Sequence, residues 1–205
     1  RAVNAATVIL AAGDFPRKGG AAWRVLAAAK RVVACDGAAN AYRRRFGKWP
    51  AVIIGDFDSM RRVRFCTAEL VHVPDQDTND LEKAMALCAA RGWRRPVIVG
   101  AGGGREDHVI GNVFRALAGG CEIVSDSGRF VPLVGTRTMC VPKGAAVSVF
   151  APDPKTRMTS RGLEWPLDGV RFDSLYRATL NRAMATRITL TADRPVSVFL
   201  ADQNS

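Results

Sequence analysis

The sequence lacks the features that mark membrane, secreted or metal-finger proteins. It has no apolar run near the roughly 20 residues of a membrane helix, and its first residues lack the apolar core of a signal peptide. Its five cysteines are odd in number and form no Cys-x-x-Cys pair. We therefore expect reduced, mostly buried thiols rather than a disulfide framework, a metal site or a redox site. Together these absences predict a cytoplasmic protein with no membrane association.

Acidic residues are also scarce, since 19 Asp and Glu stand against 30 Lys and Arg, for a net charge of +11. Such a balance occurs in nucleic-acid-binding proteins. Here the basic residues fall in scattered short groups, aromatic residues make up only 7%, and no nucleic-acid-binding signature accompanies them. We interpret most of them as solvated surface and predict no nucleic-acid partner, with attraction of a small polyanion as the alternative.

The 205 residues have room for one large domain or two small ones. In the first two thirds, short continuous apolar runs, typical of strands buried on both faces, alternate with helical segments. We expect strands at 7–12, 31–35, 51–54, 70–73 and 96–99, and helices at 21–30, 38–46, 79–91 and 108–118. Asp77 or Thr78 is expected to cap the third helix and Asp107 the fourth. This alternation predicts an α/β fold with a doubly wound, mostly parallel sheet.

The pattern changes after about residue 134, where helical periodicity gives way to short β-like stretches separated by turn-forming residues. These stretches lie at 138–141, 146–150, 176–180, 185–190 and 196–200. They predict a small antiparallel β domain. The expected organisation is an α/β domain at 1–134 and a β domain at 135–205.

Half of the 14 aspartates follow the expected strands or begin the expected helices: Asp36, Asp56, Asp58, Asp75, Asp77, Asp80 and Asp107. Ligands of open parallel sheets bind at the carboxyl ends of the strands. Carboxylates gathered there repel one another unless a cation bridges them, and oxygen ligands without His or Cys favour Mg²⁺. The alternative for any single aspartate is a helix cap or a turn.

Three parts of the chain add detail to this prediction: Asp56 with Asp58, the helix start at Asp80, and the glycines at 102–104. Asp56 and Asp58 would point to the same side if the strand continued through them, and Asp80 in a first helical turn could reach the same metal. The glycines at 102–104 would let backbone amides approach a phosphate, and Arg105 could bind its oxygens. This glycine segment is neither a P-loop nor a dinucleotide fingerprint, and 75–80 lacks the Gly and Glu of a calcium loop.

Taken together, the junction motifs resemble those of thiamine pyrophosphokinases, in the same order and at similar separations. The matching segments are Cys35-Asp36-Gly37-Ala38-Ala39-Asn40, Gly55-Asp56-Phe57-Asp58-Ser59, Asp75 to Ala84, Gly103 to Asn112, Gly162 to Leu167 and Ala178 to Asn181. The resemblance implies an α/β catalytic domain followed by a β-sandwich, in a homodimer with active sites between the subunits. It also implies Mg²⁺-dependent transfer of the pyrophosphoryl group of ATP to the hydroxyl of thiamine, which yields thiamine diphosphate and AMP.

The resemblance also implies a role for each matching residue. Asp56, Asp58 and Asp80 would bind Mg²⁺ and, with Asp75, form the catalytic set. The ATP-binding residues would be Asp36, Gly37, Asn40, Ser59, Gly103, Gly104, Arg105, Asp107, His108 and Asn112. The thiamine-binding residues would be Gln76, Asp77, Trp165, Thr179 and Asn181. The chain departs from the family pattern at Asn79, where Thr is usual, and at Leu180, where Ser is usual.

Several alternatives stay open at this point. Asp56, Asp58 or Asp75 could accept the alcohol proton. A diphosphokinase for another alcohol would share the metal site and differ in the β domain. A nucleotidyl- or glycosyltransferase with an Asp-x-Asp motif would release other products, and a nucleic-acid binder would use the positive charge alone.

Overall fold

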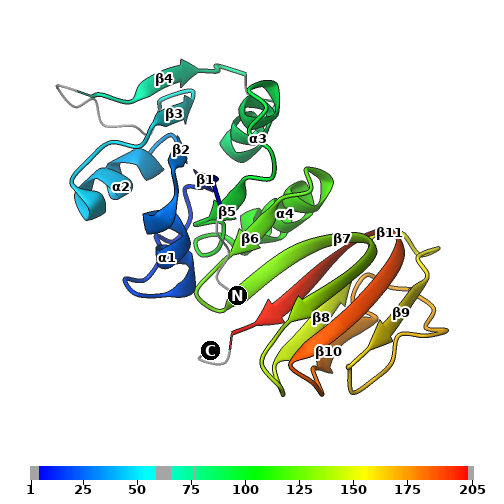
Figure 1. Ribbon diagram of the computed structural model, residues 1–205. Coiled ribbons are helices and arrows are strands. Elements are labelled where there is room, and N and C mark those ends of the chain that lie inside the picture. The colour runs from blue at the N-terminus through cyan, green and yellow to red at the C-terminus, as the bar shows by residue number, and fades with distance from the viewer. Residues whose placement is uncertain (1–4, 59–65, 76, 203–205) are drawn as a thin grey trace. The chain divides into compact units, whose positions relative to one another are not determined.

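The computed structural model describes residues 5–58, 66–75 and 77–202, and it divides into two compact units (Figure 1). The N-terminal unit ends at Arg115 and also includes Ile123–Ser125. The C-terminal unit consists of Ala116–Glu122 and the chain from Asp126 onward. The boundary expected after residue 134 falls within the strand Gly128–Cys140 of the C-terminal unit. The first half of this strand is nearly as apolar as the buried strands that precede it.

The N-terminal unit is built on a parallel sheet with the strand order β6-β5-β1-β2-β3-β4. Its strands are β1 (Thr7–Leu10), β2 (Arg31–Cys35), β3 (Val52–Gly55), β4 (Glu69–His72), β5 (Val97–Val99) and β6 (Glu122–Val124). The chain moves outward from β1 to β4 and then returns to the other side of β1 as β5, and the pairs β1–β2, β1–β5, β2–β3 and β3–β4 are all parallel. The topological switch point therefore lies between β1 and β5, as in a doubly wound fold.

Four helices connect these strands: α1 (Ala21–Ala28), α2 (Ala38–Phe46), α3 (Asp80–Ala90) and α4 (Glu106–Ala118). They confirm the predicted helices to within two residues at every end. Strands β1, β2, β3 and β5 are almost wholly buried, as expected for continuous apolar runs covered by helices. The predicted caps are wrong, because Asn79 caps α3, while Asp107 lies inside the first turn of α4.

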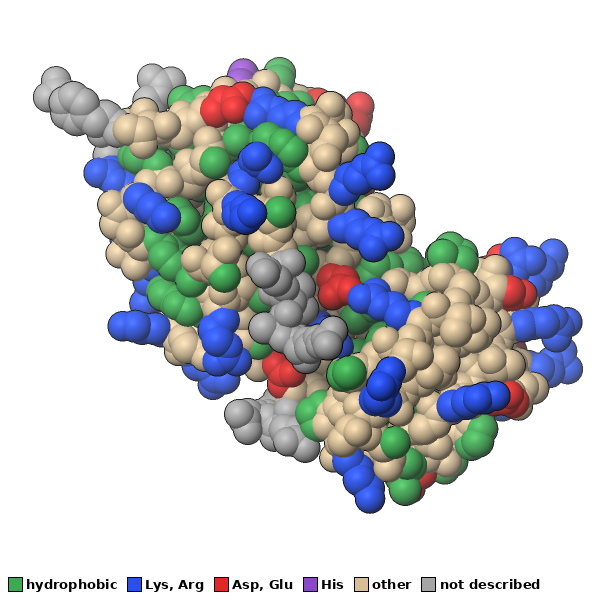
Figure 2. All heavy atoms as spheres, in the orientation of Figure 1, with side chains coloured by type: hydrophobic (Ala, Val, Ile, Leu, Met, Phe, Trp, Pro, Cys, Tyr) green, Lys and Arg blue, Asp and Glu red, His purple; other side chains and the backbone are tan. Residues whose placement is uncertain are grey.

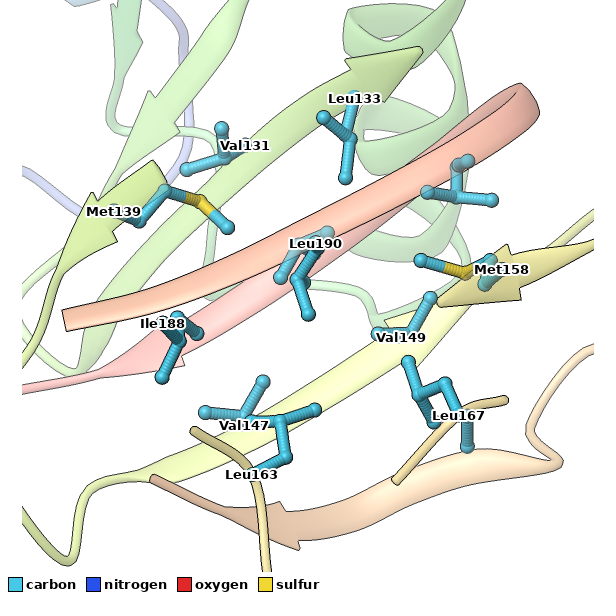
Figure 3. Packing of buried hydrophobic residues seen from close by; sticks show 14 of the residues in the cluster. Val131, Leu133, Met139, Val147, Val149, Met158, Leu163, Leu167, Ile188 and Leu190 are labelled. Carbon is cyan, nitrogen blue, oxygen red and sulfur yellow. The ribbon is translucent and has the colours of Figure 1, made fainter. Parts of the chain in front are cut away.

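The C-terminal unit consists of antiparallel strands around an apolar core, which confirms the predicted β domain. Its strands are β7 (Gly128–Cys140), β8 (Ala146–Phe150), β9 (Met158–Arg161), β10 (Ala178–Arg182) and β11 (Arg187–Ala201). Figure 3 shows side chains from β7, β8, β9 and β11 converging in this core, among them Leu133, Val149, Met158 and Leu190. Burial of such side chains is the main stabilising contribution.

Strand β11 corrects the prediction of two separate strands at 185–190 and 196–200. The register shifts between Ala192 and Val196, where Asp193-Arg194-Pro195 was expected to form a turn, but the strand continues. Its first half pairs with β7 and β9, and its second half pairs with β7 and β8. The segment is therefore a bulge, which bends a strand without ending it.

The remaining composition-based expectations concern cysteines, charge and membrane. The five cysteines, all among the described residues, form no disulfide; Cys35, Cys88 and Cys121 are buried and Cys140 is exposed, in agreement with mostly buried thiols. On the face shown in Figure 2, Lys and Arg side chains are scattered rather than gathered into one patch. No helix in the described ranges is long and apolar enough to cross a bilayer.

Candidate functional site

Three aspartates meet at the carboxyl edge of the parallel sheet. Asp36 follows β2, and Asp56 and Asp58 follow β3; each offers a carboxylate oxygen within 4.8 Å of the other two. The register of β2 on β3 brings them together, because Cys35 pairs with Ile54 and the Asp36 amide donates to the Ile54 carbonyl at 2.8 Å. Asp36 is buried, Asp56 half-buried and Asp58 exposed. This acidic triad has the hard oxygen donors that a divalent cation prefers.

A turn, rather than an extended strand, brings Asp56 and Asp58 together. Strand β3 ends at Gly55, Phe57 has a φ of +64°, and the Asp58 amide donates to Asp56 Oδ1 at 3.2 Å. Asp36 also has a positive φ, of +37°. Residues other than glycine rarely adopt such values, and those that do cluster at functional sites. The proximity predicted for the two carboxylates is confirmed, but the reason given for it is wrong.

Asp80 lies against this triad as the first residue of α3. A Cβ atom placed on Gly55 would lie 3.2 Å from Asp80 Oδ2 and 2.9 Å from the Cβ of Asp36. Only a glycine therefore allows this close approach. Burial raises the pKa of Asp80, and the charges of Asp36 and Asp56 raise it further, while the neighbouring Lys83 ammonium opposes them. Asp80 is not one of the three carboxylates that lie within 4.8 Å of one another, although it was expected to share their metal.

The start of α3 is held by a capping box. Asn79 Oδ1 accepts a hydrogen bond from the Glu82 amide at 2.9 Å, and Glu82 Oε2 accepts one from the Asn79 amide at 3.2 Å. Arg115 of α4 binds the same Glu82 oxygen at 3.0 Å. The departure from Thr at position 79 thus exchanges one good capping residue for another.

Replacing Asn79 with alanine is expected to lower the free energy of unfolding by about 1 kcal/mol, because one helix amide loses its acceptor. Asn79→Thr keeps an acceptor and should stay within a few tenths of a kcal/mol of the original. Urea unfolding followed by circular dichroism of the helices measures both. Equal losses in the two variants would contradict the capping role.

Asp75 organises the loop that precedes α3. Its carboxylate accepts hydrogen bonds from the Thr78 hydroxyl at 2.6 Å and from the Asp77 amide at 3.0 Å. The Thr78 bond, followed by the Asp77 bond, lowers the pKa of Asp75. Asp75 and Asp77 are exposed. The predicted site residues Gln76 and Ser59 lie outside the described residues.

A glycine-rich loop follows β5 beside the switch point. The Gly13 amide donates to the Gly100 carbonyl at 2.8 Å, and the Asp14 amide donates to the Gly102 carbonyl at 2.7 Å. Gly103 has a φ of +76°, and a Cβ atom there would meet the Asp14 carboxylate, so a side chain would strain the backbone and displace Asp14. The sequence interpretation gave Asp14 no role, although the Gly-Asp pair after the first apolar run was a signal for one.

Besides Gly103 and Gly104, four of the expected nucleotide-binding residues lie at the end of this loop or in α4. Asn112 donates from Nδ2 to the Ala101 carbonyl at 3.1 Å, so it anchors the loop. Arg105 and Asp107 form a two-bond ion pair, at 3.1 Å and 2.6 Å, in which each partner strengthens the charge of the other. The pKa of Arg105 is accordingly raised and that of Asp107 lowered. Both side chains, like His108, are exposed.

Gly37 and Asn40 form the first turn of α2, directly after Asp36. Gly37 is the N-cap residue, and its carbonyl accepts a hydrogen bond from the Asn40 amide at 3.1 Å. Asn40 is half-buried. The loop after β2 therefore carries one member of the acidic triad and two of the expected nucleotide-binding residues.

In the C-terminal unit, Asn181 and Trp165 are held together. The buried Asn181 donates from Nδ2 to the Trp165 carbonyl at 2.7 Å and accepts from the Trp165 amide at 3.2 Å. Trp165 is 55% exposed. Thr179 donates to the Tyr176 carbonyl at 2.9 Å, and Leu180 is exposed with a φ of +62°. Asn181 thus fixes the backbone that carries Trp165.

Family models cover most of the chain. The model described as thiamin pyrophosphokinase, catalytic domain, matches residues 22–123, and the model described as thiamin pyrophosphokinase, substrate-binding domain, matches residues 128–199. The chain belongs to the thiamin pyrophosphokinase family. The first matched region spans the N-terminal unit from α1 to β6 without β1, and the second spans the antiparallel strands from β7 to β11.

Individual thiamin pyrophosphokinases are similar to parts or the whole of the chain. Thiamin pyrophosphokinase 1 of Caenorhabditis elegans is 42% identical over 91 residues, which cover 40% of this chain and only 37% of that relative. The Candida albicans structure covers 97% of this chain and 89% of its own, at a TM-score of 0.78 and 14% identity. The Geobacillus thermodenitrificans structure covers 97% and 98%, at a TM-score of 0.75 and 22% identity. These structural similarities confirm the predicted fold class.

Proposed function

We propose that this chain transfers the pyrophosphoryl group of ATP to the hydroxyl of thiamine, yielding thiamine diphosphate and AMP, in a Mg²⁺-dependent reaction. The observation that carries the proposal is the acidic triad Asp36, Asp56 and Asp58, with Asp80 beside it, at the ligand-binding edge of a doubly wound sheet. Membership of the thiamin pyrophosphokinase family supports the choice of substrates.

The donor set fits Mg²⁺, because it consists of carboxylate oxygens without imidazole or thiolate. Asp56, Asp58 and Asp80 would hold the ion, and Asp36 is placed to share it. When bound, the ion would offset the negative charge of the ATP phosphates. Transfer of this kind depends chiefly on positioning and charge stabilisation.

In the proposed reaction the thiamine hydroxyl oxygen attacks the β-phosphorus. A bond forms between them, the bond from the β-phosphorus to the oxygen bridging it to the α-phosphorus breaks, and that electron pair leaves with AMP. The hydroxyl proton passes to Asp56, Asp58 or Asp75. Hydrogen bonds from the Thr78 hydroxyl and the Asp77 amide lower the pKa of Asp75.

The other proposed roles follow the positions of the remaining residues. ATP would be contacted by the start of α2, by Ser59 and by the glycine-rich loop with the residues that follow it. In this loop and in α4 the contacts would come from Gly103, Gly104, Arg105, Asp107, His108 and Asn112. The exposed Trp165 ring would stack on the cationic rings of thiamine. Asn181 would hold Trp165 in place, with Gln76, Asp77 and Thr179 completing the thiamine site.

The deciding experiment supplies Mg²⁺, ATP and thiamine and separates the products by chromatography. We expect thiamine diphosphate and AMP in equal amounts, and neither product after removal of the metal with a chelator. ADP with thiamine monophosphate would overturn the reaction type while retaining the metal site. ATP binding without either product would instead point to another alcohol as the acceptor, with Leu180 as the departure to investigate.

Assembly and location complete the proposal. A homodimer with active sites at the subunit interface is what the family resemblance implies, and the cysteine usage predicts a location in the cytoplasm. Light scattering of the purified protein should then give about twice the 22.1 kDa mass of the chain. A monomeric mass with full activity would remove the shared-site part of the proposal.

A further inference from the structure

Lys83 is a buried lysine beside the acidic triad. Its side chain is only 4% exposed, although lysine is almost never buried unless it is paired. Its Nζ lies 3.3 Å from Asp80 Oδ1, three residues earlier on the same helix. The ammonium is therefore neither a solvated surface charge nor an exposed group that steers ligands, and its position must be explained by what it contacts.

The two carboxylate oxygens of Asp80 have different surroundings. Oδ1 accepts the hydrogen bond from Lys83. Oδ2 faces Gly55, since a Cβ atom there would lie 3.2 Å from Oδ2 and, at the same time, 2.9 Å from the Cβ of Asp36. The bond to Oδ1 thus restricts the rotation of the carboxylate and keeps Oδ2 on the side of the acidic triad.

The helix start makes this restraint rigid. Asp80 and Lys83 are three residues apart at the start of α3. Side chains at this spacing are neighbours on the surface of a helix. The capping box of Asn79 and Glu82 holds that turn, and Arg115 ties Glu82 to α4. Lys83 itself is buried, so its stem has little freedom.

We infer that Lys83 is a positioning residue for the proposed cation site, acting through Asp80. It binds one oxygen of Asp80 and leaves the other on the side of the acidic triad. Removing a residue that orients a metal ligand in this way commonly weakens metal binding about 10- to 100-fold. The inference rests on the proposed function, because it requires that the acidic triad bind a divalent cation.

The test is Mn²⁺ binding, measured by electron paramagnetic resonance or calorimetry in the full chain without ATP or thiamine. Lys83→Met keeps the length of the side chain and removes the ammonium. We expect about tenfold weaker Mn²⁺ binding in this variant, because Asp80 is no longer oriented. A lysine acting only through its charge would have the opposite effect, since its removal would tighten the binding of a cation.

The control is the same substitution in an Asp80→Asn background. There Lys83→Met should cause no further loss, because its effect passes through the Asp80 carboxylate. If Lys83→Met alone fails to fold, Mn²⁺ binding is compared between Asp80→Asn and the double variant. The double variant leaves no unpaired buried charge. An additional loss of affinity in that background would overturn the inference.

The outcomes also separate the inference from the proposed function. Unchanged or tighter Mn²⁺ binding by Lys83→Met would overturn the positioning role and leave the metal site standing. No Mn²⁺ binding by the unmodified chain would overturn the metal site, and the positioning role with it.

Discussion

Asp58→Ala is expected to lower turnover by about a thousandfold while the protein stays folded, because one of the three closely spaced carboxylates is lost. A bound cation contributes several kcal/mol of transition-state stabilisation, and about 4 kcal/mol corresponds to a thousandfold in rate. Asp58 is the exposed member of the triad, so its removal leaves no buried cavity. The measurement is the rate of thiamine diphosphate formation at saturating Mg²⁺, ATP and thiamine.

Asp173→Ala is a matched control for this substitution. Asp173 is an exposed aspartate of the C-terminal unit whose carboxylate lies 3.9 Å from Arg177. An exposed pair of this kind contributes little to stability, so the variant should keep its turnover and its unfolding midpoint. Full activity in Asp58→Ala would remove Asp58 from the metal site, and an equal loss in Asp173→Ala would show that the assay responds to something other than the triad.

Gly55→Ala is expected to lower the free energy of unfolding by about 3 kcal/mol and to abolish Mn²⁺ binding. Gly55 has a φ of +156°, which residues with a side chain rarely adopt, and this strain costs about 1–3 kcal/mol. Its new Cβ would also press on Asp36 and Asp80, at 2.9 Å and 3.2 Å. Since these are the groups that form the site, both stability and cation binding should suffer.

Gly47→Ala separates strain from crowding. Gly47 ends α2 with a φ of +69°, and a Cβ there would meet nothing within 4 Å. It should therefore cost only about 1 kcal/mol and leave Mn²⁺ binding unchanged. Urea unfolding and Mn²⁺ titration of both variants make the comparison. A Gly55→Ala variant as stable as Gly47→Ala, with intact Mn²⁺ binding, would show that Asp36 and Asp80 do not pack against Gly55 as described.

Local physical rules account for the parts of the fold that the sequence predicted well. Continuous apolar runs such as Val97–Val99 are buried on both faces in a parallel sheet, and the helices between them follow the expected ranges closely. The errors lie where two local signals compete. Asp193-Arg194-Pro195 has the composition of a turn, but pairing on both sides of it keeps β11 continuous as a bulged strand.

The candidate site divides in the same way. The sequence by itself determined that Asp36, Asp56 and Asp58 follow strands, and since parallel strands end at one edge of a sheet, all three were expected at that edge. Only the tertiary structure decided that Asp36 joins the other two within 4.8 Å, whereas Asp75 is occupied in its own loop. It also decided that Lys83 is buried against Asp80. These outcomes depend on positive φ values, on a missing Cβ and on distances between residues far apart in the chain, none of which local sequence pattern encodes.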